Sequence, residues 1–66
     1  MRKFEIHMPE ITAKRLWDRL VADGLRDCGR EMVIVEYDDL GRAEDGLRLA
    51  KSDAERVTEI YAVRGM

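Results

Sequence analysis

The sequence is poor in the residues that small proteins use to reinforce themselves covalently. It has one cysteine, Cys28, and one histidine, His7, among 66 residues. A single cysteine excludes a disulfide within the chain, and a single histidine disfavours a four-ligand zinc site. A domain of this size buries only about 60% of the surface that its unfolded chain exposes. We therefore expect one small domain, residues 1–66, that gains stability by forming a homodimer.

Long hydrophobic runs are missing as well. No stretch approaches the ~18 apolar residues that cross a membrane, and residues 1–5 lack the apolar stretch of a signal peptide. Hydrophobic residues make up 45% of the chain and charged residues 39%, which is typical of a folded domain with a densely charged surface. With a lone thiol and no export signal, the expected location is cytoplasmic, away from membranes.

Excess charge is small but unevenly distributed. The formal net charge is −2. Residues 1–30 contain seven basic and five acidic side chains, whereas residues 31–66 contain five basic and nine acidic ones. The second half therefore repels phosphate groups, and the charge pattern favours a protein partner with a basic surface over nucleic acid.

The first half of the chain has clear periodicities. Residues 2–8 alternate between apolar and polar side chains, which predicts a half-buried strand that ends at Pro9. Residues 10–23 predict a helix, because apolar side chains recur at spacings of three and four. Gly24 is suited to the left-handed cap at the end of this helix. The apolar stripe consists of Ile11 or Ala13, then Leu16, Trp17, Leu20 and Val21.

The rest of the chain allows two interpretations. Residues 27–30 form a connection and residues 31–37 a central strand, because this run is β-branched and apolar on both faces. In the favoured interpretation, residues 47–51 are a third strand, and Ser52 opens a helix with a capping box completed by Glu55. The order is then β-α-β-β-α. In the alternative, residues 42–52 are a helix and residues 57–63 a strand, which gives β-α-β-α-β. Both are α+β folds, with two helices on one face of a three-stranded sheet.

Acidic side chains cluster around the end of the predicted central strand. They do not follow the spacing of a calcium-binding loop, and Arg42 lies among them, so we expect no metal and no cofactor. Their alternative roles are solvation of a turn and docking on a basic partner. The candidate partner-binding residues of this cluster are Glu36, Asp38, Asp39, Glu44 and Asp45. Trp17 is the remaining candidate: it is either a core anchor or, where exposed, an interface hot spot.

Lys3-Phe4-Glu5-Ile6-His7-Met8-Pro9-Glu10, followed by a helix, resembles the start of a ribbon-helix-helix repressor. The resemblance covers roughly the first third of the chain. It implies a dimer that reads the DNA major groove with the polar face of the strand, here Lys3, Glu5 and His7. The sequence departs from the family after Gly24, where the apolar run at residues 32–35 replaces the second helix.

These features lead to three functional hypotheses. The first is a small non-enzymatic regulatory domain that binds another protein through an exposed strand edge or through its acidic surface. An accessory inhibitor of the phage or plasmid type is one protein of this description. The second is the DNA-binding repressor. The third is a minimal oligomeric enzyme, in which Asp38 and Asp39 meet His7 or Cys28 across a subunit boundary.

Overall fold

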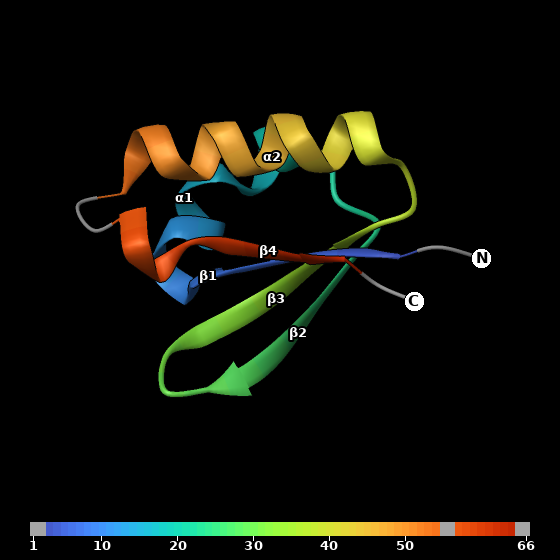
Figure 1. Ribbon diagram of the computed structural model, residues 1–66. Helices are drawn as coiled ribbons and strands as arrows, with labels where there is room; N and C mark the ends of the chain where they lie inside the picture. The colour runs from blue at the N-terminus through green and yellow to red at the C-terminus, as the bar shows by residue number, and fades with distance from the viewer. Residues whose placement is uncertain (1–2, 55–56, 65–66) are drawn as a thin grey trace.

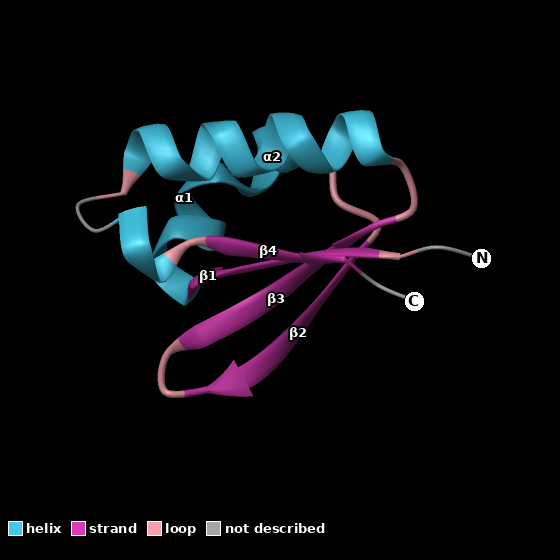
Figure 2. Cartoon of the chain, viewed as in Figure 1, coloured by secondary structure: helices cyan, strands magenta, loops and turns pink. Residues whose placement is uncertain are grey.

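The computed structural model describes residues 3–54 and 57–64. The chain alternates between strands and helices in the order β-α-β-β-α-β, with one 3₁₀ turn before the last strand (Figures 1 and 2). The elements are β1 (Phe4–Pro9), α1 (Glu10–Leu20), β2 (Gly24–Gly29), β3 (Met32–Tyr37), α2 (Leu40–Asp53), the 3₁₀ turn Val57–Glu59 and β4 (Tyr61–Arg64).

The four strands form one sheet in the order β2-β3-β1-β4. Every neighbouring pair is antiparallel, which is the split β-α-β arrangement of ferredoxin-like domains. β1 and β3 are therefore central strands, whereas β2 and β4 are the edges. Because β1 is bonded on both sides within its own chain, it is not available for the intermolecular ribbon of a ribbon-helix-helix dimer.

Both helices lie on the same face of the sheet, as predicted (Figure 2), and buried side chains from both layers form the core. Alternation along β1 and β3 sends one set of side chains into this core. On the opposite face, Glu5 and His7 of β1 and Glu36 of β3 are only partly buried. The core residues are Ile6, Met8, Ala13, Leu16, Leu20, Val33, Val35, Tyr37, Ala43, Ala50 and Ile60.

The prediction of three strands was wrong, because the segment expected to be a helix cap and a connection is β2. Helix α1 ends at Leu20, and its C-cap is Val21 in the left-handed conformation, with φ of 49°, rather than Gly24. The turn from β2 into β3 has positive φ at Arg30 and Glu31, 55° and 60°. This geometry matches the twist of a tight hairpin but normally selects asparagine and glycine, so the sequence gives little sign of it.

The favoured interpretation of the second half was also wrong, and the alternative is closer to the structure. Residues 47–51 are helical rather than extended, and Ser52 lies in the last turn of α2 instead of starting a helix. Ser52 Oγ donates a hydrogen bond to the carbonyl of Leu49 at 2.8 Å, while Glu55 lies outside the described residues. The start of α2 is set by Asp39, whose side chain accepts a hydrogen bond from the N–H of Arg42 at 2.9 Å.

Tyr37 connects the sheet to both helices. Its side chain is fully buried, and its hydroxyl donates a hydrogen bond to the carbonyl of Leu20 at 2.8 Å. Helix α2 passes over the ring at Gly46, where an added Cβ would collide with the ring and the hydroxyl. Burial raises the pKa of Tyr37 above its ordinary value of 10.0.

In the described part of the chain, neither helix has the combination of length and apolar character that a membrane-spanning helix requires.

Candidate partner-binding groove between α1 and β2

Helix α1 carries a second stripe beside the one that faces the core. Glu10, Ala13, Lys14 and Trp17 are spaced three and four residues apart, so they share one side of the helix, toward β2. Trp17 is 43% exposed. The buried residues of α1 are Thr12, Ala13, Leu16 and Leu20, so the indole lies at the margin of the core rather than inside it.

A groove of about 510 Å³ separates this stripe from β2. Ala13 and Val33 line it and are themselves almost fully buried. Trp17 from the helix and Leu25 from the strand line it as well, and Leu25 is 48% exposed. The groove therefore has an apolar base and one exposed large apolar side chain from each element, and charged residues complete its lining, namely Glu10, Lys14, Arg26 and Asp27.

The strand beside this groove is an edge of the sheet. β2 pairs with β3, and among the described residues no strand lies on its other side. Five of its six residues are exposed. An edge strand presents N–H and C=O groups along its open side, and an extended segment of another chain can bond to them. The open part is short, because the register with β3 shifts between Asp27 and Gly29.

Three of the four charged residues that line the groove form ion pairs within the chain, while the carboxylate of the fourth, Asp27, accepts a hydrogen bond from the N–H of Gly29 at 3.2 Å. Arg26 points to the uncovered face of the sheet, where it donates hydrogen bonds to Glu36 at 2.6 Å and Glu5 at 2.9 Å. These carboxylates, with the Glu5 hydrogen bond as the main cause, raise the pKa of Arg26. On the helix side, Lys14 and Glu10 form an ion pair at 3.3 Å.

The acidic residues predicted to form one cluster are divided among three elements. Glu36 lies on β3 and faces the uncovered side of the sheet, where Arg26 and Lys3 neutralise it. Asp39 is used as the N-cap of α2. The three remaining candidates are exposed: Asp38 in the β3–α2 connection, and Glu44 and Asp45 on α2, where Asp45 pairs with Arg48 at 3.0 Å.

Arg42 lies within the acidic run of the sequence, but its guanidinium makes its hydrogen bonds outside that cluster. It reaches back to the α1–β2 connection, where it donates hydrogen bonds to both carboxylate oxygens of Asp23 and to the carbonyl of Val21. Asp23 also accepts a hydrogen bond from the N–H of Asp38 at 2.7 Å, and this bond and the Arg42 contact lower the pKa of Asp23. The network joins the end of α1 to the start of α2, which is a structural role.

The residues of the enzyme hypothesis lie in separate places in one chain. His7 is on the uncovered face of the sheet, where its ring stacks on Tyr61 with 4.7 Å between centroids. Cys28 is exposed near the end of β2. Asp38 and Asp39 lie between β3 and α2. Among residues 3–54 and 57–64, no group of three or more His, Cys, Asp or Glu side chains is arranged to hold a metal ion.

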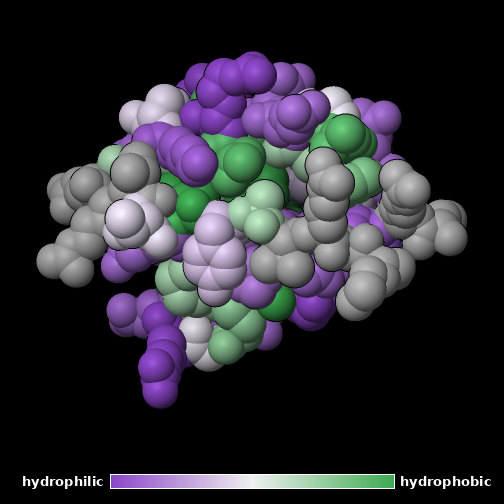
Figure 3. All heavy atoms as spheres, in the orientation of Figure 1, coloured by the Kyte–Doolittle hydropathy of each residue, from purple (hydrophilic) through white to green (hydrophobic). Residues whose placement is uncertain are grey.

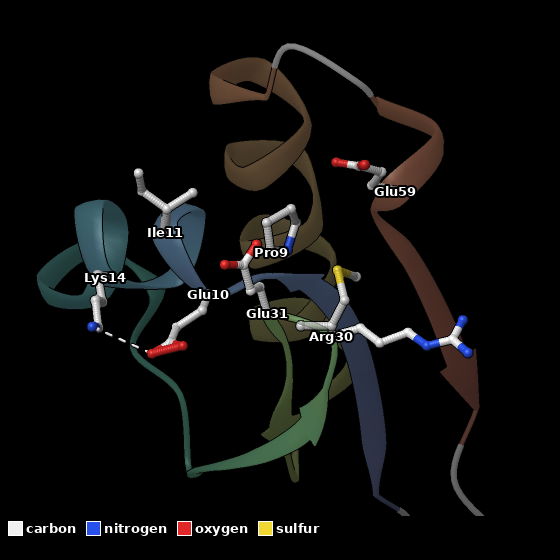
Figure 4. Close-up of a pocket in the computed structure, with 8 residues that line it drawn as sticks. Pro9, Glu10, Ile11, Lys14, Arg30, Glu31 and Glu59 are labelled. Atoms are coloured by element: carbon white, nitrogen blue, oxygen red, sulfur yellow. Dashed lines mark ion pairs between the residues drawn. The ribbon is translucent and has the colours of Figure 1, made fainter.

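A second cavity of about 510 Å³ lies at the start of α1, next to the β2–β3 turn, and shares Glu10 and Lys14 with the groove. In Figure 4 the Lys14–Glu10 ion pair lies on one side of this cavity, while the guanidinium of Arg30 points away from it toward β4. Glu31 and Glu59 come from different segments, and their carboxylates do not converge with Arg30 on one point. The polar groups thus do not form a common ligand site.

Comparisons with protein-family models, with curated proteins and with solved structures gave no match for this chain.

Proposed function

We propose that the chain is a small non-enzymatic protein-binding domain that holds an extended segment of a partner protein in the groove between α1 and β2. The observation that carries the proposal is the coincidence of an open strand edge with a groove that has an apolar base. The backbone of β2 supplies hydrogen bonds, while Trp17 and Leu25 supply apolar surface for every second side chain of the added strand. By holding this segment, the domain would regulate the protein to which the segment belongs.

Trp17 is the expected anchor of this interaction. A tryptophan that becomes fully buried in an interface commonly contributes 2 kcal/mol or more, which corresponds to a loss of affinity of roughly 30-fold when it is truncated. Its present exposure of 43% leaves apolar area to be buried by a partner. Leu25, 48% exposed, provides the facing wall.

The test compares partner capture by wild type and by Trp17→Ala. A cell lysate is passed over each bait, and proteins retained by wild type alone are purified and titrated individually. We expect Trp17→Ala to weaken binding of the true partner by at least about 10-fold. Ile11→Ala is the matched control, because Ile11 is an exposed apolar residue of the same helix, 62% exposed, and does not line the groove.

The acidic surface is the competing docking site, and it is tested by a second variant. Asp38, Glu44 and Asp45 are changed to asparagine or glutamine, while Asp39 is kept because it caps α2. Exposed acidic charges accelerate the encounter with a basic partner. Salt weakens this attraction, because at physiological ionic strength charges farther apart than ~8–10 Å are largely screened. Capture that is lost in this variant at low salt but unchanged in Trp17→Ala would move the site to the acidic surface.

A further inference from the structure

Over residues 3–54 and 57–64, β4 is the second strand of the sheet with a neighbour on one side only, and its residues differ in chemistry from those of β2. The first three residues of β4, Tyr61, Ala62 and Val63, are uncharged, and Arg64 at its end is its one charged residue. In contrast, β2 contains Arg26 and Asp27 in its middle and a shift in register. Charges and bulges are the devices by which edge strands avoid pairing with copies of themselves. β4 lacks both over these three residues.

The two-fold symmetry of a homodimer makes β2 and β4 differ further in how their charges would pair. In a continuous antiparallel sheet, a two-fold axis at the junction places one residue opposite itself and its neighbours opposite each other in reverse order. On β2, an axis at Arg26 opposes two arginines, and an axis at Asp27 opposes two aspartates. An axis at Leu25 opposes Asp23 to Asp27. Each of these registers puts like charges face to face, which is destabilising.

The same operation on β4 opposes no like charges. With the axis at Ala62, Ala62 lies opposite its own copy, and the backbone of Tyr61 lies opposite that of residue 63. We propose that a second copy of this chain pairs antiparallel with β4, with the two-fold axis at Ala62, and extends the sheet to eight strands in a homodimer.

The region above β4 also fits a second copy. A groove of about 190 Å³ lies between α2 and this edge, and apolar residues from both layers line it, including Leu40, Leu47 and Ala62. Figure 3 shows hydrophobic side chains gathered at this place, below the charged outer side of α2. Leu40, which lines this groove, is 45% exposed. Tyr61, on the opposite face of the sheet beside His7, is 49% exposed. A dimer at this edge would reduce the exposure of this apolar surface.

Across the same axis, the α2 helix of one copy has charges that complement those of the α2 helix of the other copy. Exposed acidic residues lie in the first half of the helix, Glu44 and Asp45, and exposed basic residues in the second half, Arg48 and Lys51. A two-fold axis reverses the direction of the partner's helix, so the acidic half of one copy lies toward the basic half of the other. Charge complementarity of this kind favours the antiparallel arrangement and disfavours others.

The dimer leaves the groove between α1 and β2 free. The strand order β2-β3-β1-β4 continues in reverse through the second copy, so the two β2 edges lie at opposite ends of the extended sheet. The inference therefore stands independently of the proposed function, and if both hold, the assembly presents two identical partner sites.

The test uses a cysteine at the proposed axis. In an antiparallel pair, directly opposed Cα atoms are about 4.5–5.5 Å apart, within the range of about 4.4–6.8 Å that a disulfide spans. Ala62→Cys is made in a Cys28→Ala background and oxidised at tens of micromolar. We expect most chains to become covalent dimers, and we expect wild type to scatter light as a particle of about twice the 7.7 kDa of one chain.

Two further variants complete the test. Arg26→Cys in the same background reports on β2 and should form no covalent dimers under oxidation. Ala62→Asp places two carboxylates opposite each other and should reduce the scattering mass of an otherwise folded protein to that of one chain. A wild-type mass of 7.7 kDa at about 100 micromolar, or cross-linking of Arg26→Cys as complete as that of Ala62→Cys, would overturn the proposal.

Discussion

Replacement of Gly46 by alanine tests how closely α2 packs on the sheet. An alanine Cβ at this position would lie 2.8 Å from Cζ and 3.3 Å from Cε1 of Tyr37, and closer still to the hydroxyl oxygen. The ring cannot move away easily, because it is fully buried and its hydroxyl is bonded to the carbonyl of Leu20. Either the helix shifts outward, or Tyr37 leaves its position and gives up that hydrogen bond.

The magnitude follows from three opposing contributions. Glycine to alanine within a helix normally stabilises by about 0.5–1 kcal/mol. Overpacking of a close-packed core costs typically 1–3 kcal/mol, and loss of the Tyr37 hydrogen bond costs about 1 kcal/mol more. We therefore expect Gly46→Ala to lower the free energy of unfolding by about 1–3 kcal/mol, against the direction that helix propensity alone predicts.

Urea unfolding at constant protein concentration measures this change. With a slope of about 1 kcal/mol per molar urea, the midpoint should fall by at least about 1 M. Gly41→Ala in the same helix does not touch Tyr37, but its Cβ would lie 3.1 Å from the Asp39 carboxylate, so that change reports on the N-cap instead. In a Tyr37→Phe background, Gly46→Ala should cost about 1 kcal/mol less, because the colliding hydroxyl is gone. A Gly46→Ala protein as stable as wild type would refute the packing described for Tyr37.

Two further predictions concern the ends of α2 and the alkaline limit of stability. Asp39→Ala should lower the free energy of unfolding by about 1 kcal/mol through loss of the N-cap, while Ser52→Ala should change it by less than about 0.5 kcal/mol. Chemical unfolding of both variants measures these changes. A larger loss for Ser52→Ala than for Asp39→Ala would contradict the boundaries of α2. The pKa of Tyr37 is raised in the folded state. The contribution of this residue to the free energy of unfolding is therefore complete below the ordinary pKa of 10.0, and it is lost as the pH rises through the folded pKa. Stability measured from pH about 9 to about 11 should therefore fall more steeply for wild type than for Tyr37→Phe, and parallel curves would contradict this.

The elements that sequence predicts well are those whose periodicity coincides with burial. β1 alternates, α1 has apolar residues at helical spacing, and β3 is a continuous apolar run, so their existence and type follow from the sequence. β2 does not have such a pattern, because Arg26, Asp27 and Cys28 are exposed at an edge. Its turn residues, Arg30 and Glu31, are also not those that a tight hairpin prefers.

The second half was misassigned because its local signals conflict with tertiary packing. Leu47-Arg48-Leu49 alternates like a strand, and Gly41 and Gly46 weaken a helix prediction over this region. Gly46 is compatible with α2 because the Tyr37 ring occupies the space that a side chain would need. That relationship joins residues of different elements and is not visible in any local window.

The candidate site was predictable in part. Trp17 could be placed on the apolar side of α1, and its role in an interface depended on partial exposure, which the structure provides. Leu25 and the open edge follow only from the strand order. The acidic cluster divides because alternation along β3 turns Glu36 toward the uncovered face of the sheet, where Arg26 binds it. Proximity in sequence was a poor guide to proximity in space here.

The pairing of β1 with β4 has a mechanical consequence. Phe4 at the start of β1 lies opposite Arg64 at the end of β4, so the chain enters and leaves the sheet at the same corner. A force applied through these two residues opens the ladder one hydrogen bond at a time, as in a zipper, instead of loading several bonds together in shear. The domain should therefore yield at low force when stretched along its chain, whatever its resistance to heat or urea. The same closeness means that a short linker between the ends would give a circular chain with little strain.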